Sequence, residues 1–212
     1  MPTFPTPEPI SVTVDVLSAT VTVIAADRAD TVVDVRPADA AKKADVRAAE
    51  QTRVDFSGGT LTVRSSKNWR TYTAFGGNPS IEVTIEVPTG SRVHGTAAVG
   101  RLLGTGELGE CELEIAAGDI VVERAGGSVT AKTSKGDIRI GEAARGELRL
   151  EVAMGEIEVG INPGSAAQLD TNTQYGSVRH LMGPVDRAQQ ETVRVRARNS
   201  FGDIVIRHAA AV

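Results

Sequence analysis

Apolar and polar residues alternate along most of this chain, and glycine interrupts the alternation at short intervals. In the second half a five-residue phrase returns: glycine, a small polar or acidic residue, an apolar residue, any residue, and an apolar residue. Its copies begin at Gly118, Gly136, Gly155, Gly176 and Gly202, after a degenerate copy at Gly100. They lie 18, 18, 19, 21 and 26 residues apart. Alternation at period two predicts β-strands, and a regular recurrence predicts a repeat fold.

A second phrase lies about halfway between these copies, beginning at Gly109, Gly127 and Gly146. Each unit of about 18 residues therefore holds two short strands. An antiparallel meander or a β-solenoid with parallel, stacked rungs could be built from such units. Stacked rungs place equivalent positions above one another and select the same residue type in each. The column Ile120, Ile138, Ile157, Val178 and Ile204 meets that demand and favours the solenoid, although His180 departs from the neighbouring column.

The first ninety residues show strands without the repeat. Residues 10–24 alternate on both sides of Ser18-Ala19, which predicts a hairpin, and residues 53–64 predict a second hairpin around a glycine-rich turn. Helix-forming residues predict one short helix near 39–51, beginning at Asp39. We therefore expect an all-β protein that forms one continuous domain over residues 1–212. In this scheme residues 10–90 form an antiparallel region with a short helix, and residues 91–208 form the β-strand repeats.

The longest irregular segment, residues 65–80, holds three of the seven aromatic residues beside two basic ones. Long loops and exposed aromatic residues are common at binding sites. The same rings could instead cover an open end of the repeat core. The segment is predicted to be either a partner-binding loop or a cap, through Lys67, Trp69, Arg70, Tyr72 and Phe75.

Charge and composition exclude several classes of function. The net charge of −4 argues against nucleic acid as a partner, because binding phosphates requires a strongly basic face. The lone Cys111 predicts a buried, inert thiol. The first nine residues contain four prolines and no basic residue, so they do not resemble a secretory signal, and no stretch has the ~18 apolar residues of a membrane span. We expect a cytoplasmic protein without membrane insertion.

The acidic position of the phrase is the main candidate for chemistry. In stacked rungs, Asp119, Asp137, Glu156 and Asp203 would form a row of carboxylates about 4.8 Å apart. Such a row could bind Ca²⁺ or supply paired acids for polysaccharide cleavage, but Gly-Asp is also ordinary turn chemistry, which we favour. His94, His180 and His208 lack the spacing of a metal site, and no serine lies in a nucleophile elbow. We predict no catalytic residue, no metal and no cofactor.

The Gly-Asp-Ile-x-Val phrases, the opening Pro-Glu-Pro-Ile-Ser-Val-Thr-Val and the closing Ser-Phe-Gly-Asp-Ile-Val-Ile-Arg carry a family resemblance. They resemble an actinobacterial member of the β-strand-repeat family called "putative adhesin", a domain of unknown function. The resemblance covers essentially the whole chain and implies a β-solenoid comparable to a toast rack. It implies no catalytic residues.

These observations favour a non-catalytic scaffold or interaction module, whose partner is an unidentified protein or a second copy of the chain. The alternatives are an envelope-associated adhesin or stress-sensing module and, third, a carbohydrate-active solenoid enzyme. The discriminating features are a leader or membrane partner for the second, and a groove with clustered carboxylates and aromatic rings for the third.

Overall fold

The computed structural model describes residues 1–65, 79–183 and 191–209. Sixteen strands and one helix form within these ranges. The helix α1 covers Lys43–Gln51. The strands are β1 Thr3–Pro5, β2 Ser11–Ala26, β3 Asp30–Pro37, β4 Arg53–Ser57, β5 Thr60–Arg64, β6 Ile81–Pro88, β7 Arg92–Leu108, β8 Cys111–Ala125, β9 Val129–Lys135, β10 Ile138–Ala143, β11 Gly146–Met154, β12 Ile157–Ile161, β13 Ala166–Tyr175, β14 Val178–Leu181, β15 Thr192–Phe201 and β16 Ile204–His208.

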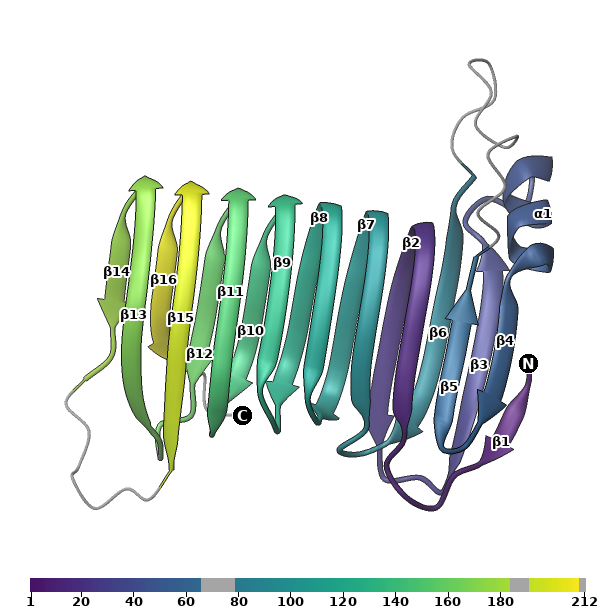
Figure 1. Ribbon diagram of the computed structural model, residues 1–212, viewed down its shortest axis with the longest axis horizontal. Coiled ribbons are helices and arrows are strands. Elements are labelled where there is room, and N and C mark those ends of the chain that lie inside the picture. Colours follow the sequence, from purple (N-terminus) through teal and green to yellow (C-terminus); the bar gives the residue numbers. More distant parts are fainter. Residues whose placement is uncertain (66–78, 184–190, 210–212) are drawn as a thin grey trace.

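The strands form two layers with an apolar core between them (Figure 1). The front layer runs in the order β4, β5, β2, β7, β8, β9, β11, β15, β13. The back layer runs β1, β3, β6, β2, β7, β8, β10, β12, β16, β14. The long strands β2, β7 and β8 belong to both layers, because each bends near its middle and crosses from front to back. In the later rungs a glycine separates the front strand from the back strand.

The rungs stack in parallel register, as a β-solenoid requires. On the back layer Ile120 pairs with Ile138, and Ile138 pairs with Ile157. Each of these isoleucines is completely buried. Ile204 is also completely buried, whereas Val178, on the outermost back strand, is 37% exposed. The predicted apolar column is therefore the core of the back layer except at Val178, and the repeat fold inferred from its spacing is confirmed.

A column of glycines marks the corner where each rung turns from front to back. Gly136 has φ +134°, a conformation that L side chains rarely adopt. A Cβ atom built on it would lie only 2.1 Å from the carbonyl oxygen of Gly118 in the neighbouring rung. Gly155 stands in the same relation to Gly136, at 2.0 Å. The recurring glycine is therefore required by the close approach of stacked corners as well as by backbone conformation.

The final strand pair does not occupy the end of the stack. β15 lies between β11 and β13, and β16 lies between β12 and β14. The end rung is therefore β13–β14, and the later rung β15–β16 is inserted inside it. The burial of the two strands agrees with this order: the inward Val193, Val195 and Ala197 of β15 are completely buried, whereas Leu169, Thr171 and Thr173, the inward side chains of β13, remain partly exposed at the end of the stack. His180, which departs from its column, lies exposed on the end rung.

The N-terminal region differs from the prediction in two respects. Residues 11–26 form the single strand β2 rather than a hairpin, because Ala19 pairs with the corner residue Gly100 and takes the same bend between layers. The region is also not wholly antiparallel. β2 runs parallel to β5, β6 and β7, while only the pairs β1–β3, β3–β6 and β4–β5 are antiparallel. Parallel stacking therefore begins at β2, well before residue 91.

The predicted helix near 39–51 is present but begins at Lys43. Asp39 does not cap it; its Oδ1 accepts the N–H of Ala41 in a turn just before the helix. Asp45 in the first helical turn is buried, and its carboxylate accepts the N–H groups of Asp39 and Ser80. These hydrogen bonds hold the helix against the chain that leads into β6 and retain a carboxylate at the helix start, where the helix dipole favours negative charge.

Candidate functional site

The aromatic loop predicted from the sequence lies outside the described residues. Its five candidates, Lys67, Trp69, Arg70, Tyr72 and Phe75, fall within residues 66–78. The choice between a cap and a partner-binding loop therefore stays a prediction.

The acidic row is engaged with the backbone of neighbouring rungs. The Oδ1 atom of Asp119 accepts the N–H of Asp137 at 3.1 Å, and that of Asp137 accepts the N–H of Glu156 at 2.9 Å. Asp203 accepts the N–H of Ser177 at 2.8 Å, a hydrogen bond that lowers the pKa of its carboxyl group. These three aspartates of the row thus each tie one corner to the next, which favours the turn interpretation. In the part of the chain that the structure describes, no three His, Cys, Asp or Glu side chains gather as a metal site would require.

Millimolar Ca²⁺ is expected to leave the melting temperature unchanged, because one oxygen each of Asp119, Asp137 and Asp203 already accepts a backbone hydrogen bond. Differential scanning calorimetry with and without chelator measures this. A rise of several degrees that the chelator reverses would show that the row binds the cation in the native state only.

Cys111 is a buried thiol in the front layer, 1% exposed. Burial, with a smaller contribution from Glu110, raises its pKa to about 12. Since the thiolate is the reactive species, we expect no reaction with a thiol reagent at pH 8 in the native protein and full reaction after unfolding in guanidinium. Rapid labelling of the native protein would contradict the packing of β8.

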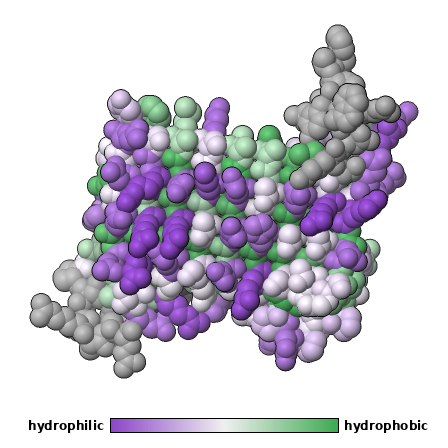
Figure 2. Space-filling view, in the orientation of Figure 1, coloured by the Kyte–Doolittle hydropathy of each residue, from purple (hydrophilic) through white to green (hydrophobic). Residues whose placement is uncertain are grey.

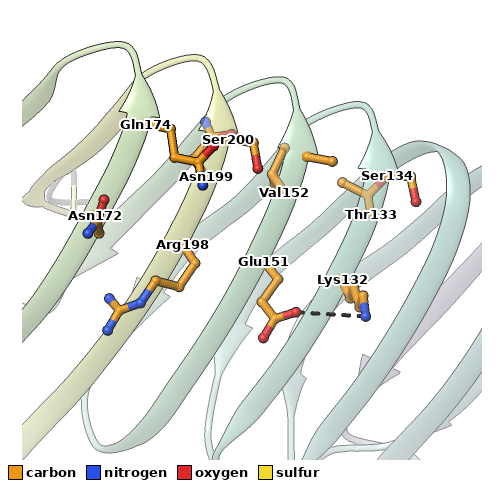
Figure 3. A pocket seen from close by; sticks show the side chains of 11 residues that line it. Lys132, Thr133, Ser134, Glu151, Val152, Asn172, Gln174, Arg198, Asn199 and Ser200 are labelled. Atoms are coloured by element: carbon orange, nitrogen blue, oxygen red, sulfur yellow. Dashed lines mark ion pairs between the residues drawn. The ribbon is translucent and has the colours of Figure 1, made fainter.

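A polar hollow of about 360 Å³ lies on the outer surface of the front layer, over β9, β11, β15 and β13 (Figure 3). The outward side chains at its centre are small: Ser134, Ala153 and Ser200. On the side away from the corner, longer side chains border it. Arg198 extends toward β13 and Glu151 toward Lys132, so that these two side chains diverge and leave the space between them open. Asn172 and Gln174 complete the lining on β13.

Ion pairs fix the charged side chains around this hollow. The Nη2 atom of Arg198 donates to both carboxylate oxygens of Asp170, at 2.9 and 2.8 Å, and this contact lowers the pKa of Asp170. The carboxylate of Glu147 forms ion pairs with Arg149 at 3.1 Å and with Arg196 at 3.3 Å. The hydrogen bond from Arg149 is the main reason for the lowered pKa of Glu147. Hydrophilic side chains accordingly gather on the left half of the face in Figure 2, over these strands.

Three large apolar side chains stand at the corner beside the hollow. Met154, Phe201 and Tyr175 pair with one another across β11, β15 and β13, each one residue beyond the hollow along its strand. Their exposures are 54%, 50% and 66%. The rings of Tyr175 and Phe201 are stacked almost parallel, with centroids 4.8 Å apart. We call these three residues the corner ledge.

Sequence reasoning missed the corner ledge because it took each repeated phrase to begin at the glycine and did not consider the residue before it. Met154, Tyr175 and Phe201 each precede a corner glycine, and two of the seven aromatic residues occupy that position. The signal that could have revealed the ledge is a large apolar residue directly before a glycine, at a position where the turn exposes the side chain to solvent. Combining it with the polar hollow required the strand order, because β15 lies between two strands that precede it in the chain.

Comparison with known proteins identifies the fold family. The chain belongs to the family described as Toastrack DUF4097, whose model matches residues 103–208. No curated protein sequence matches the chain. In the described residues, no helix combines the length and apolar character needed to cross a membrane.

Solved structures are similar to this chain at low sequence identity. One is a "putative cell adhesion protein" from Clostridium sporogenes, with a TM-score of 0.53 and 8% identity over 96% of this chain and 93% of that chain. Another is a "putative adhesin" from Bacteroides fragilis, with a TM-score of 0.46 and 13% identity over 97% of this chain and 95% of that one. The first likeness concerns the fold alone.

Proposed function

We propose that this protein is a non-catalytic interaction module that binds its partner at the polar hollow and the corner ledge. The observation that carries the proposal is the ledge itself. Exposed aromatic and methionine side chains are enriched where proteins bind partners. Here Met154, Phe201 and Tyr175 lie side by side in a chain with only 3% aromatic residues. The solenoid behind them supplies a rigid base, since each rung is hydrogen-bonded to its neighbours.

The carboxylates near the hollow favour binding over catalysis. Cleavage of a glycosidic bond uses a carboxylic acid with a raised pKa as proton donor, together with a second carboxylate. The pKa values of Glu147 and Asp170 are instead lowered, because each accepts a hydrogen bond from an arginine. Glu151 forms an ion pair with Lys132 at 3.8 Å. All three carboxylates therefore suit structural ion pairs better than proton donation.

Cell-surface attachment is the more specific form of this proposal. Proteins of similar fold carry the names "putative cell adhesion protein" and "putative adhesin". An adhesin or envelope-associated sensor must reach the cell surface, whereas an intracellular scaffold remains in the cytoplasm. Fractionation of the native cells, followed by immunoblotting of each fraction, distinguishes these two forms of the proposed function.

The proposal is tested by retention of cell components on the immobilised protein. The double variant Phe201→Ser/Tyr175→Ser removes both rings of the ledge at exposed positions, so the fold should persist. Val99→Ser is the matched control, since Val99 is another exposed corner residue, on β7, several rungs from the hollow. Chromatography of native extract should retain at least one component on the wild-type and control proteins and lose it on the double variant. Retention of nothing, or equal retention by all three proteins, would overturn the proposal.

Self-association is a second candidate, favoured by the end rung. Among the described residues, β13 pairs only with β15 and β14 only with β16, so both strands have an unpaired outer edge. β13 is ten residues long and contains neither proline nor lysine, the residues that commonly protect edge strands. Antiparallel pairing of two β13 edges about a two-fold axis would bury these backbone groups.

Thr171→Lys tests this candidate by placing a charge on the inward side of the β13 edge, where Thr171 contacts His180 at 3.4 Å. Sedimentation equilibrium should detect a dimer of the wild-type protein and a monomer of the variant. A wild-type monomer at high protein concentration, or an unchanged dimer of the variant, would exclude pairing through β13.

A further inference from the structure

The surface around the hollow is basic although the protein as a whole is acidic. Six lysine or arginine side chains and three carboxylates belong to β9, β11, β13 and β15 and lie on their outer face or at the corner. They are Lys132, Lys135, Arg149, Arg194, Arg196 and Arg198, with Glu147, Glu151 and Asp170. The excess of three positive charges contrasts with the net charge of −4 for the chain. Such a local excess favours an anionic ligand by charge complementarity.

Part of this positive charge is hydrogen-bonded to a neutral partner. The Nε atom of Arg194 donates to the amide oxygen of Gln168 at 3.0 Å, a neutral acceptor, and the carboxylate whose charge it interacts with, Glu147, lies on the neighbouring strand β11. The guanidinium of Arg198 also lies beside the hollow, but its Nη2 atom is already paired with the carboxylate of Asp170. A guanidinium is well suited to binding a carboxylate on a ligand, because its planar array of donors matches the two oxygens.

The uncharged groups of the hollow suit hydroxyl groups. Ser134 and Ser200 offer hydroxyl groups, while Asn172 and Gln174 offer amides that can donate and accept at once. The volume of about 360 Å³ lies within the range of small-ligand sites. Because the strands run across the hollow about 4.8 Å apart, an extended polymer would meet equivalent positions in successive rungs.

The corner ledge adds a flat apolar platform. One face of the Tyr175 ring is stacked on Phe201. β13 is the outermost front strand among the described residues, so no strand lies beyond the other face of that ring. Sugar rings present C–H groups that pack on aromatic faces, while their hydroxyl groups require polar partners nearby. The ledge and the hollow supply both.

We propose that the hollow and the corner ledge bind an acidic oligosaccharide, a sugar polymer whose units carry carboxylate groups. This inference rests on the proposed function and names its ligand class. The sugar ring packs on Tyr175, its hydroxyl groups bond to the serine and amide side chains of the hollow, and a carboxylate further along the polymer pairs with Arg194, whose guanidinium donates to a neutral amide. Single-stranded nucleic acid also combines flat rings with negative charge, but it carries a phosphate at every unit and needs more unpaired basic residues than this surface offers.

Isothermal titration calorimetry with four probes tests the ligand class. The probes are hexagalacturonate, hexamannuronate, the neutral cellohexaose and a ten-residue oligothymidylate. At least one of the two acidic sugars should bind at least tenfold more tightly than cellohexaose and the oligothymidylate, and its affinity should fall when NaCl is raised from 50 to 500 mM.

Four variants locate the binding. Tyr175→Ala should lower the affinity for the acidic sugar at least tenfold. Arg194→Gln should lower this affinity severalfold and make it less dependent on salt. Arg53→Gln removes the same charge from an exposed position on β4, at the far end of the front layer, and should change nothing. Ser200→Trp, which fills the hollow, should also abolish binding if the ledge variant proves unstable.

Each other result overturns the inference. Tighter binding of the oligothymidylate would make the surface a nucleic-acid site, and equal binding of cellohexaose would remove the role of charge. Binding of neither acidic sugar would reject the ligand class. If the ledge still governs retention of a component from native extract in that case, the proposed interaction module stands and only its ligand class is wrong.

Discussion

Gly136→Ala is expected to lower the free energy of unfolding by about 3–5 kcal/mol, the range of severe packing changes. Two effects combine at this corner. The backbone has φ +134°, which an L side chain rarely adopts, and the new Cβ would lie 2.1 Å from the carbonyl oxygen and 2.5 Å from the carbonyl carbon of Gly118. These atoms belong to the backbone, so relief requires the two stacked rungs to separate. Guanidinium unfolding monitored by circular dichroism measures the loss.

Gly58→Ala is the matched control for conformation without crowding. Gly58 also has positive φ, at +56°, but a Cβ atom there would meet nothing within 4 Å. Its expected cost is only about 1–2 kcal/mol, the cost of left-handed backbone alone. Equal losses in the two variants would mean that the corners are not in close contact and that the rungs stack differently from this account.

Ile138→Ala is expected to cost about 2–4 kcal/mol, because it opens a cavity in the completely buried column of the back layer. The next residue supplies the control. Arg139 points outward, its side chain is 54% exposed, and its ion pairs with Asp137 and Glu158 are long, at 3.5 and 3.8 Å. Arg139→Ala should therefore change stability by no more than about 0.5 kcal/mol. Similar losses in both variants would contradict the inward and outward assignment.

The repeat spacing allowed the solenoid to be predicted because each rung repeats the same packing environment. Ile120, Ile138 and Ile157 occupy one column, so a single residue type satisfies all three positions. Glycine recurs because every corner contacts the corner of the neighbouring rung in the same way. Features that are repeated in every unit leave a periodic record in the sequence.

The order of the strands in the sheet is not indicated by any periodic pattern in the sequence. The order of β13 and β15 is seen only in their pairing, because β15 bonds to both β11 and β13, whereas β13 bonds only to β15 among the described residues. The bend of β2 was misjudged for a related reason. Ala19 stands where later rungs have glycine, so alternation on both sides of it looked like a hairpin. In each case the deciding interaction joins residues far apart in the chain.

The candidate site was unpredictable for the same reason. The hollow is lined by β9, β11, β13 and β15, and its two aromatic neighbours come from strands whose order reverses that of the chain. Sequence reasoning placed the binding aromatic residues in the loop around Trp69 instead. Local composition identifies an unusual loop, but it cannot identify small, polar and aromatic side chains that meet only after the rungs stack.

Engineered disulfides test the central claim most directly, because the candidate site exists only if β15 lies between β11 and β13. Met154 and Phe201 pair on adjacent strands, within the range a disulfide can bridge, whereas Met154 and Tyr175 lie two strands apart, about 10 Å. Under mild oxidation, the double variant Met154→Cys/Phe201→Cys should form an intramolecular disulfide, and Met154→Cys/Tyr175→Cys should not. Mass spectrometry of the digested proteins distinguishes them. Cross-linking of the second pair and not the first would place β13 beside β11 and contradict the strand order on which the site depends.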